Sequence, residues 1–349
     1  MRWIRETGPV VGAITLALGV GAIVTALTGY SVPQVFRHLA VGAFGDWYRL
    51  AQTLTQATPI IFTSLSFLIA FRAGLFNIGA EGQLYMGAFF AAWAGFSFQL
   101  PPVLHPIVCL LFGAAAGAVW GFIPGWLRAK RGANEFVTTM MLSYVAINFT
   151  SWLVAPGGPF HGTAWANQTV RIATSAQFPR LLRGAQLSWG LIVGVLVAFL
   201  VWYLLFRTPR GYELRAVGQN PLAAEYGGIN VTRNMILALT LAGALAGMGG
   251  AAETLGTHRR FIELFSPGYG WDGIAGGLIA RAHPLGAILA AVMMGALRAG
   301  GQAVDRAGVA PADLAAVIQG LVILFVVAPE LIRYFRRLVR RKKLGDIEL

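Results

Sequence analysis

The chain is poor in charged residues and nearly lacks cysteine. Only 12% of its 349 residues are Asp, Glu, Lys or Arg, whereas 56% are hydrophobic and the mean hydropathy is +0.65. Ordinary soluble domains are about 25% charged. The single cysteine, Cys109, lies inside an apolar run, which excludes a disulfide framework and a cysteine-based metal site. This balance predicts a membrane protein.

The usual motifs of enzymes are missing as well. A phosphate-binding loop ends in Gly-Lys followed by Ser or Thr, but none of the three lysines, Lys130, Lys342 and Lys343, follows a glycine. There is no His-Glu-x-x-His or Gly-x-Ser-x-Gly, and the histidines are not spaced as metal ligands. We therefore predict no catalytic residue, no metal site and no cofactor bound by this chain itself.

What the chain does have is a series of apolar runs long enough to cross a bilayer, which predict about ten transmembrane helices. They lie at about 10–29, 51–71, 83–98, 104–127, 135–155, 188–206, 234–255, 265–281, 284–300 and 312–333. The first run is too long for a signal peptide and is predicted to be an uncleaved helix. Glycines and Pro267 interrupt the run at 265–281, which predicts a short, broken or re-entrant helix.

Basic residues predict the orientation of these helices. The net charge of +13 comes from short clusters at the ends of the apolar runs, a pattern typical of membrane topology and not of nucleic-acid binding. With both termini in the cytoplasm, the inner segments carry about twice as many Lys and Arg as the outer ones. We predict a multi-pass protein of the cell membrane with cytoplasmic N- and C-termini.

An internal repeat is also visible. His105-Pro106 recurs as His283-Pro284, and Gly117-Ala118 recurs at the same spacing as Gly295-Ala296. The matched spans run in opposite directions, which is the inverted repeat of many transporters. We predict one membrane domain over 1–349, with halves at about 51–155 and 234–333 and a cytoplasmic loop at about 207–233. A ladder of small residues at every fourth position predicts close helix packing: Gly113, Gly117, Gly121 and Gly125.

Two polar segments, 71–83 and 132–148, lie at or inside predicted spans. Polar side chains are costly there unless they face the bundle interior, a partner or water, so they are predicted to lie on or beside a substrate pathway. The candidate residues are Asn77, Glu81, Gln83, Asn134, Glu135, Thr138 and Asn148. Two alternatives stay open: the first segment as a solvated turn, and Asn134 as a helix cap.

The cytoplasmic loop contains the signals of a short helix. Asn220 is suited to the N-cap, Pro221 to the first helical position and Gly227-Gly228 to the end. A helix of about six residues is not stable alone in water, so it must lie on another surface. Its small apolar surface favours a protein partner, and the membrane surface is the alternative.

Both polar segments resemble a known family. The run from Arg72 to Gln83, RAGLFNIGAEGQ, and the run from Gly132 to Met141, GANEFVTTMM, resemble the nucleoside and simple-sugar branch of ABC importer permeases. This branch is related to the branched-chain amino acid permeases. In the family that the second run resembles, Val is more usual at the place of Phe136. A third segment, Gly270 to Ala275, is similar but less close, because Gly276-Gly277 replaces bulkier residues.

The resemblance implies an all-α, type II importer-like permease that works by alternating access. Its implied partners are an ATPase subunit that binds the ATP, a second homologous permease chain, an extracytoplasmic substrate-binding lipoprotein and membrane lipid, with no nucleic acid. The loop helix resembles a coupling helix, which implies ATPase-coupling roles for Arg215, Gly218, Asn220, Pro221, Ala223, Ala224 and Gly228. Nucleosides are the expected substrate, with simple sugars as the alternative.

A hypothesis from another class is an ion-coupled secondary transporter or channel. It requires acidic residues within the membrane, and Glu81, Glu135, Glu253 and Asp272 are available for that role. A scaffold without transport is the third hypothesis, although it has no use for polar residues at the start of two spans. Co-purification of an ATPase would distinguish the importer from both.

Overall fold

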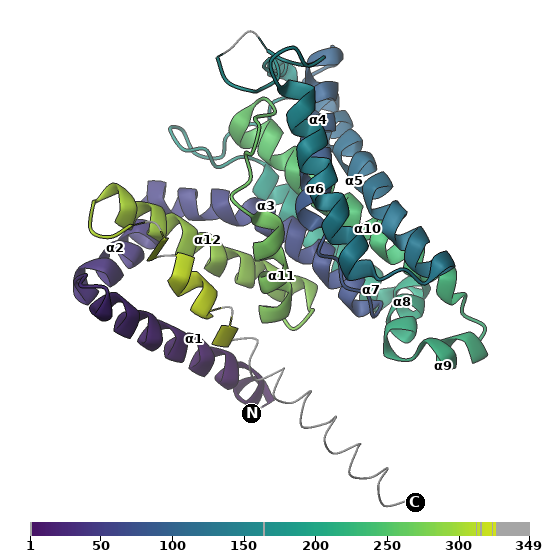
Figure 1. Ribbon diagram of the computed structural model, residues 1–349, viewed down its shortest axis with the longest axis horizontal. Coiled ribbons are helices and arrows are strands. Elements are labelled where there is room, and N and C mark those ends of the chain that lie inside the picture. The colour runs from purple at the N-terminus through teal and green to yellow at the C-terminus, as the bar shows by residue number, and fades with distance from the viewer. Residues whose placement is uncertain (1, 163–164, 312, 315, 323, 326–349) are drawn as a thin grey trace, which may run out of the picture. The chain divides into compact units, whose positions relative to one another are not determined.

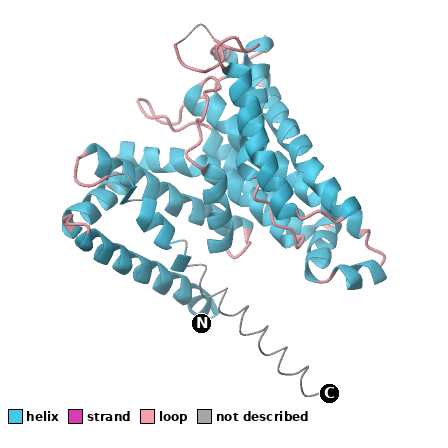
Figure 2. Ribbon diagram, viewed as in Figure 1, coloured by secondary structure: helices cyan, strands magenta, loops and turns pink. Residues whose placement is uncertain are grey.

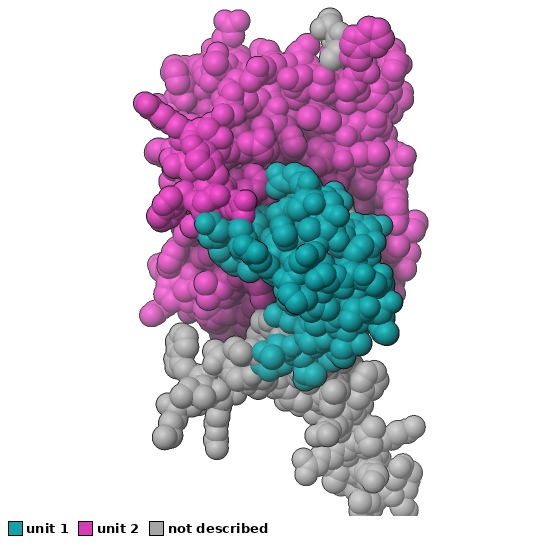
Figure 3. Space-filling view, turned by 90° about the vertical axis from the view of Figure 1, so that its left-hand side faces the viewer, with its two compact units in different colours: residues 1–45, 297–349 teal, residues 46–296 magenta. Residues whose placement is uncertain are grey.

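The structure is a computed structural model, shown in Figure 1. It describes the chain except residues 1, 163–164, 312, 315, 323 and 326–349, with residues 2–11 and 14 described by backbone alone. The described residues form helices joined by loops (Figure 2), with two isolated antiparallel bridges, Gln168 to Ile262 and Arg180 to Ser188, and no sheet. The all-α prediction is confirmed. The chain divides into two compact units, 46–296 and 1–45 with 297–349 (Figure 3).

The larger unit holds the spans predicted from 51–71 to 265–281, most of the span predicted at 284–300, and the loop predicted at 207–233. Its helices are α3 (Trp47–Arg72), α4 (Ala80–Ser97), α5 (Leu104–Arg131), α6 (Glu135–Val154), a 3-10 turn (Thr174–Ala176), α7 (Gly190–Arg207), α8 (Pro209–Gln219), α9 (Pro221–Tyr226), α10 (Val231–Glu253), a π-helical turn (Thr254–His258), α11 (Tyr269–Ile279) and the first part of α12 (Pro284–Arg306).

Six of the described helices are long and apolar enough to cross a membrane: α3, α5, α6, α7, α10 with its π turn, and α12. Helix α11 has 11 residues, or roughly 17 Å at 1.5 Å per residue, which is too short for a hydrocarbon core of about 30 Å. The helix in the run at 265–281 is therefore short, as its glycines and Pro267 predicted. The last predicted span, 312–333, lies largely outside the described residues.

Helix α10 is the centre of the larger unit, and it packs against α5, α4 and α3 (Figure 1). Gly117 of α5 lies against the backbone of Gly243 and Gly247 in α10, and Gly87 of α4 also contacts Gly247. A Cβ at any of these positions would overlap backbone atoms of the neighbouring helix. Lipid provides no hydrophobic drive for helix association, so such close contacts must hold the bundle together. The predicted packing role of the glycine ladder is confirmed.

The smaller unit contains α1 (Arg2–Leu27), α2 (Val32–Phe44), the last part of α12 and a segment up to residue 325. Its core includes Val35, Leu39, Val304 and Ile318. Helix α2 is not among the predicted spans, because its 13 residues are too few to cross a bilayer. The buried residues of α2, Val35, Leu39, Gly42 and Ala43, follow the three-to-four spacing of one helix face. This pattern explains why α2 buries one side only.

Candidate functional site

The polar segment at 71–83 forms a buried hydrogen-bonded loop between α3 and α4. Asn77 has no exposed surface, and its Nδ2 donates to Ser66 Oγ at 3.1 Å and to Gln83 Oε1 at 2.8 Å. Its Oδ1 accepts from the Gly79 amide at 3.0 Å and from Gln83 Nε2 at 3.3 Å. The structure therefore brings two of the predicted pathway residues, Asn77 and Gln83, into direct contact.

Helix α6 is joined to this loop by two hydroxyl groups. Thr139 Oγ1 accepts a hydrogen bond from the Ile78 amide and Ser143 Oγ accepts one from the Gly82 amide, each at 3.3 Å. Gly82 lies so close to Ser143 that a side chain there would overlap the α6 backbone. The two motifs that carry the family resemblance thus pack directly on each other.

Glu81 points to a third element, the short helix α11. Its carboxylate accepts a hydrogen bond from the Gly270 amide in the first turn of α11, where the backbone amides carry partial positive charge. Thr63 of α3 donates to the Tyr269 carbonyl at 2.8 Å, next to this contact. Glu81 and Asp272 are both buried. Glu81 is therefore an electrostatic cap that fixes the start of α11.

The other predicted pathway residues lie on α6. Asn134 is the N-cap, with its side chain accepting from the Phe136 amide at 2.9 Å, and Glu135 pairs with Arg128 at 3.2 Å. Thr138 donates to the Asn134 carbonyl at 3.1 Å. Asn148 is exposed and donates to the Tyr144 carbonyl of its own helix at 2.8 Å. Asn134 thus caps α6, as the alternative interpretation predicted. Asn148 lies on the outer surface of this chain.

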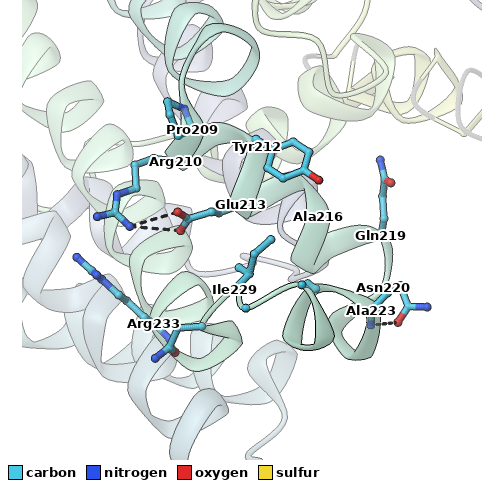
Figure 4. A pocket seen from close by; sticks show the side chains of 14 residues that line it. Pro209, Arg210, Tyr212, Glu213, Ala216, Gln219, Asn220, Ala223, Ile229 and Arg233 are labelled. Carbon is cyan, nitrogen blue, oxygen red and sulfur yellow. Dashed lines mark hydrogen bonds and ion pairs between the residues drawn. The ribbon is translucent and has the colours of Figure 1, made fainter.

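The loop helix predicted at 220–228 is present as α9. The Asn220 side chain accepts from the Ala223 amide at 3.1 Å, Pro221 begins the helix and Gly228 has φ +79°. Between α8, α9 and the start of α10 lies a hollow of about 610 Å³ (Figure 4). Arg210 and Glu213 of α8 form an ion pair at its wall, at 3.3 Å.

The two faces of α9 differ. Ala224 is 5% exposed and is held against the rest of the chain, whereas Leu222 is 68% and Tyr226 94% exposed. Leu222 and Tyr226 are four residues apart and share one face of the helix. This exposed apolar pair is the part of α9 that is available to a partner.

Helix α8 meets the polar loop at a close backbone contact. A Cβ on Gly218 would overlap the Arg72 carbonyl and crowd the Gly74 amide. Beside this contact, the guanidinium groups of Arg215 and Arg72 lie 5.1 and 5.6 Å from the ring centroid of Phe206, at the end of α7. The residues predicted for coupling are therefore connected to the segment predicted for the pathway.

Several residues of this connection were missed by sequence reasoning. Phe206 also stacks on His283 at 5.6 Å, and Arg72 donates to the Ala282 carbonyl at 2.8 Å. Burial, followed by the charge of Arg72, lowers the pKa of His283 below its ordinary value, which favours the neutral ring. One sequence signal could have pointed to this connection: Phe206 is an aromatic residue directly before the basic residues that follow the apolar run at 188–206.

At the end of α10, the sequence analysis named Glu253 but missed the π-helical turn that pairs it with His258. The buried carboxylate of Glu253 lies 3.6 Å from His258 Nε2 across the π-helical turn, and Arg259 follows with φ +58°. The His258 ring lies edge-on to Phe265 at 5.7 Å. Single π-helical turns are rare and often occur at functional sites. Within the described part of the chain, no group of three or more His, Cys, Asp or Glu is arranged to hold a metal ion.

Six helices long and apolar enough to cross a membrane, packed around a buried polar loop, are the architecture of a multi-pass membrane protein. Residues 49–327 match the family described as branched-chain amino acid transport system / permease component. The chain belongs to this family of ABC permeases, in its nucleoside and simple-sugar branch.

Individual relatives cover nearly the whole chain. It is 35% identical over 336 residues to the guanosine ABC transporter permease protein NupP of Bacillus subtilis strain 168, covering 95% of each chain. It is 33% identical over 345 residues to the glucose ABC transporter permease protein TsgB13 of Haloferax volcanii, covering 96% of this chain and 90% of the relative. It is 32% identical over 329 residues to the nucleoside ABC transporter permease protein NupB of Lactococcus lactis subsp. cremoris, covering 90% and 88%.

Two of these organisms have a second similar permease. NupQ of Bacillus subtilis, also named a guanosine permease, is 28% identical over 252 residues and covers 70% of this chain and 78% of the relative. NupC of Lactococcus lactis, also named a nucleoside permease, is 29% identical over 258 residues and covers 70% and 79%.

Proposed function

We propose that this chain is the transmembrane permease subunit of an ATP-driven importer of nucleosides that works by alternating access. The names of NupP and NupB, at 35% and 32% identity, support the nucleoside assignment. TsgB13 is named for glucose at 33% identity, so simple sugars are the alternative substrate.

One observation carries the mechanism: the capped helix α9 is connected by contacts through α8 to the buried polar loop. Helix α9 follows α8, Gly218 of α8 lies on Arg72 and Gly74, and the loop that follows is bonded through Asn77 to Gln83 in α4. A partner that moved α9 would therefore move the ends of α3 and α4. A path of packed elements of this kind lets ATP-driven closure of a partner open the spans to one side.

We also propose how the chain crosses the membrane and which partners it has. Both termini lie in the cytoplasm, about ten spans form one permease domain over 1–349, and the two halves are an inverted repeat. The ATPase subunit holds the ATP, and this chain binds no cofactor. An extracytoplasmic binding lipoprotein delivers the substrate. The pairs NupP with NupQ and NupB with NupC support a second, homologous permease chain.

With a second permease chain present, the exposed side of α6 can border a substrate pathway. One face of α6 carries residues that follow one another at steps of three or four positions. They are Asn134, Thr138, Met141, Val145 and Asn148. Met141 and Val145 are each 52% exposed, and Asn148 is exposed too. We propose that this face borders the substrate pathway, while Asn77, Glu81, Gln83 and Glu135 support it from within the bundle.

Uptake by cells tests the substrate. Cells that depend on this chain for import are given labelled guanosine in the presence of excess unlabelled adenosine, uridine, ribose or glucose. The proposal expects nucleosides to compete and sugars to have no effect. No uptake of labelled guanosine, together with uptake of labelled ribose or glucose by the same cells, would replace the nucleoside assignment by the sugar one.

A further inference from the structure

A second hollow, of about 500 Å³, lies between the end of α5 and the first turns of α10. Its walls are formed by Lys130 of α5 and by one side of α10, with Thr232, Arg233, Ile236, Leu237 and Thr240. Arg233 also lines the hollow of Figure 4, so the two are neighbours. This second hollow lies alongside the α10 span and does not touch α9.

Two of the residues that line this hollow, Lys130 and Arg233, are positively charged. In the part of the chain that the structure describes, neither Lys130 nor Arg233 has a carboxylate within 4 Å, although their neighbours Arg128 and Arg210 are paired with Glu135 and Glu213. The hollow therefore presents two cations that no carboxylate of the described residues pairs with, and it suits an anionic ligand.

The wall changes from charged to apolar along α10. From Arg233 the lining continues to Ile236, Leu237 and Thr240, roughly 10 Å further along the helix at 1.5 Å per residue. The Thr240 hydroxyl donates to the Ile236 carbonyl at 2.8 Å, so its polar group is satisfied within the helix. A ligand that fits this wall is anionic at one end and apolar along its length.

Exposed aromatic residues of α5 indicate the level of the hollow relative to the bilayer. Trp126 is one turn before Lys130 and 39% exposed, and Phe122, one turn deeper, is 44% exposed. Exposed tryptophan followed by lysine is typical of the boundary between hydrocarbon and headgroups. The cations therefore lie at headgroup level, with the apolar wall below them.

From these four observations we infer that the hollow binds an anionic phospholipid. Its phosphate lies between Lys130 and Arg233, and one acyl chain lies along Ile236, Leu237 and Thr240. Basic pockets beside spans on the cytoplasmic side suit such headgroups. The choice of the cytoplasmic leaflet rests on the proposed function, which places α8 to α10 on that side; the binding itself does not.

Lipid titration of the purified transporter complex in neutral detergent micelles, read by native mass spectrometry, tests this inference. The probe is dioleoylphosphatidylglycerol, with dioleoylphosphatidylcholine as the neutral comparison. The variant Lys130→Gln/Arg233→Gln removes both cations of the hollow. The control Arg131→Gln/Arg306→Gln removes two other basic residues, neither of which lines it. We expect the first variant to bind phosphatidylglycerol at least tenfold more weakly, and the control to bind it like the unmodified complex.

Two further arms distinguish the source of the anion. Millimolar inorganic phosphate should not displace the lipid, and Leu237→Gln should weaken lipid binding several-fold, because the acyl chain contributes to it. Equal phosphatidylglycerol affinity in both double variants would overturn the inference. So would full displacement by phosphate with no effect of Leu237→Gln, or loss of the ATPase from Lys130→Gln/Arg233→Gln in phosphatidylcholine alone, which would assign the cations to a protein contact. None of these readouts depends on nucleoside uptake, so they test the lipid site separately from the proposed substrate.

Discussion

The backbone of Gly218 in α8 lies directly on the backbone of Gly74, in the turn that follows α3. Gly74 has φ +74°, a conformation that favours glycine, and a Cβ on Gly218 would overlap the Arg72 carbonyl. This contact joins α8, which leads into α9, directly to the buried polar loop. In the proposed mechanism, these two glycines set how closely a movement of α9 is transmitted to the spans.

Replacing the α8 glycine should weaken that transmission. We expect Gly218→Ala to push α8 away from the loop and to lower ATP-driven uptake at least tenfold, while ATP hydrolysis by the complex continues. Gly19→Ala is the matched control, since nothing lies within 4 Å of a Cβ there. Transport and hydrolysis are measured together in proteoliposomes. Normal uptake by Gly218→Ala would show that the contact does not carry the coupling.

The exposed face of α9 should matter to the partner and not to the fold. Tyr226 is 94% exposed, so Tyr226→Ala should leave the melting temperature unchanged and reduce ATPase association by about tenfold or more, as expected for an aromatic interface residue. Tyr203→Ala, at a 58% exposed tyrosine on α7, is the control. Association is measured by co-purification. An unchanged complex in Tyr226→Ala would favour the membrane surface as the place where α9 lies.

Ala224 gives the complementary result, because it is 5% exposed and faces the chain itself. Ala224→Trp should displace α9 and uncouple ATP hydrolysis from substrate, with a loss of at least tenfold in substrate-stimulated ATPase activity. Arg215→Gln keeps α9 in place and removes one charge beside Phe206, so a smaller loss is expected. Substrate-stimulated hydrolysis of the assembled complex compares them. Equal activity in Ala224→Trp and the unmodified complex would contradict a close-packed α9.

The sequence predicted α9 well because its signals are local. Asn220, Pro221 and Gly228 each act on their own backbone, and the structure has each in the expected role. The pairing of Asn77 with Gln83 could not be predicted in the same way, because its geometry depends on a turn between two helices. Contacts such as Gly218 with Gly74, or Glu81 with α11, join residues far apart in the chain, and no local pattern predicts them.

Asn77 is predicted to support the bundle from inside. Asn77→Ala leaves the Ser66 hydroxyl, the Gln83 amide and the Gly79 amide without their partner, which should cost about 3 kcal/mol of stability. Asn148→Ala removes one bond on the outside of α6 and should change stability by less than about 0.5 kcal/mol. Thermal unfolding in detergent compares the two. A stable Asn77→Ala variant that fails to transport would instead place Asn77 in the pathway itself.

The central claim is that ATP hydrolysed by a partner drives nucleosides through this chain, and the most direct test separates the energy sources. Labelled guanosine uptake is measured in proteoliposomes that contain either this chain alone or the chain with its second permease, ATPase and binding protein, with ATP supplied or with a proton or sodium gradient. The account predicts uptake only by the complete assembly with ATP. Gradient-driven uptake by the chain alone would contradict it and identify a secondary transporter.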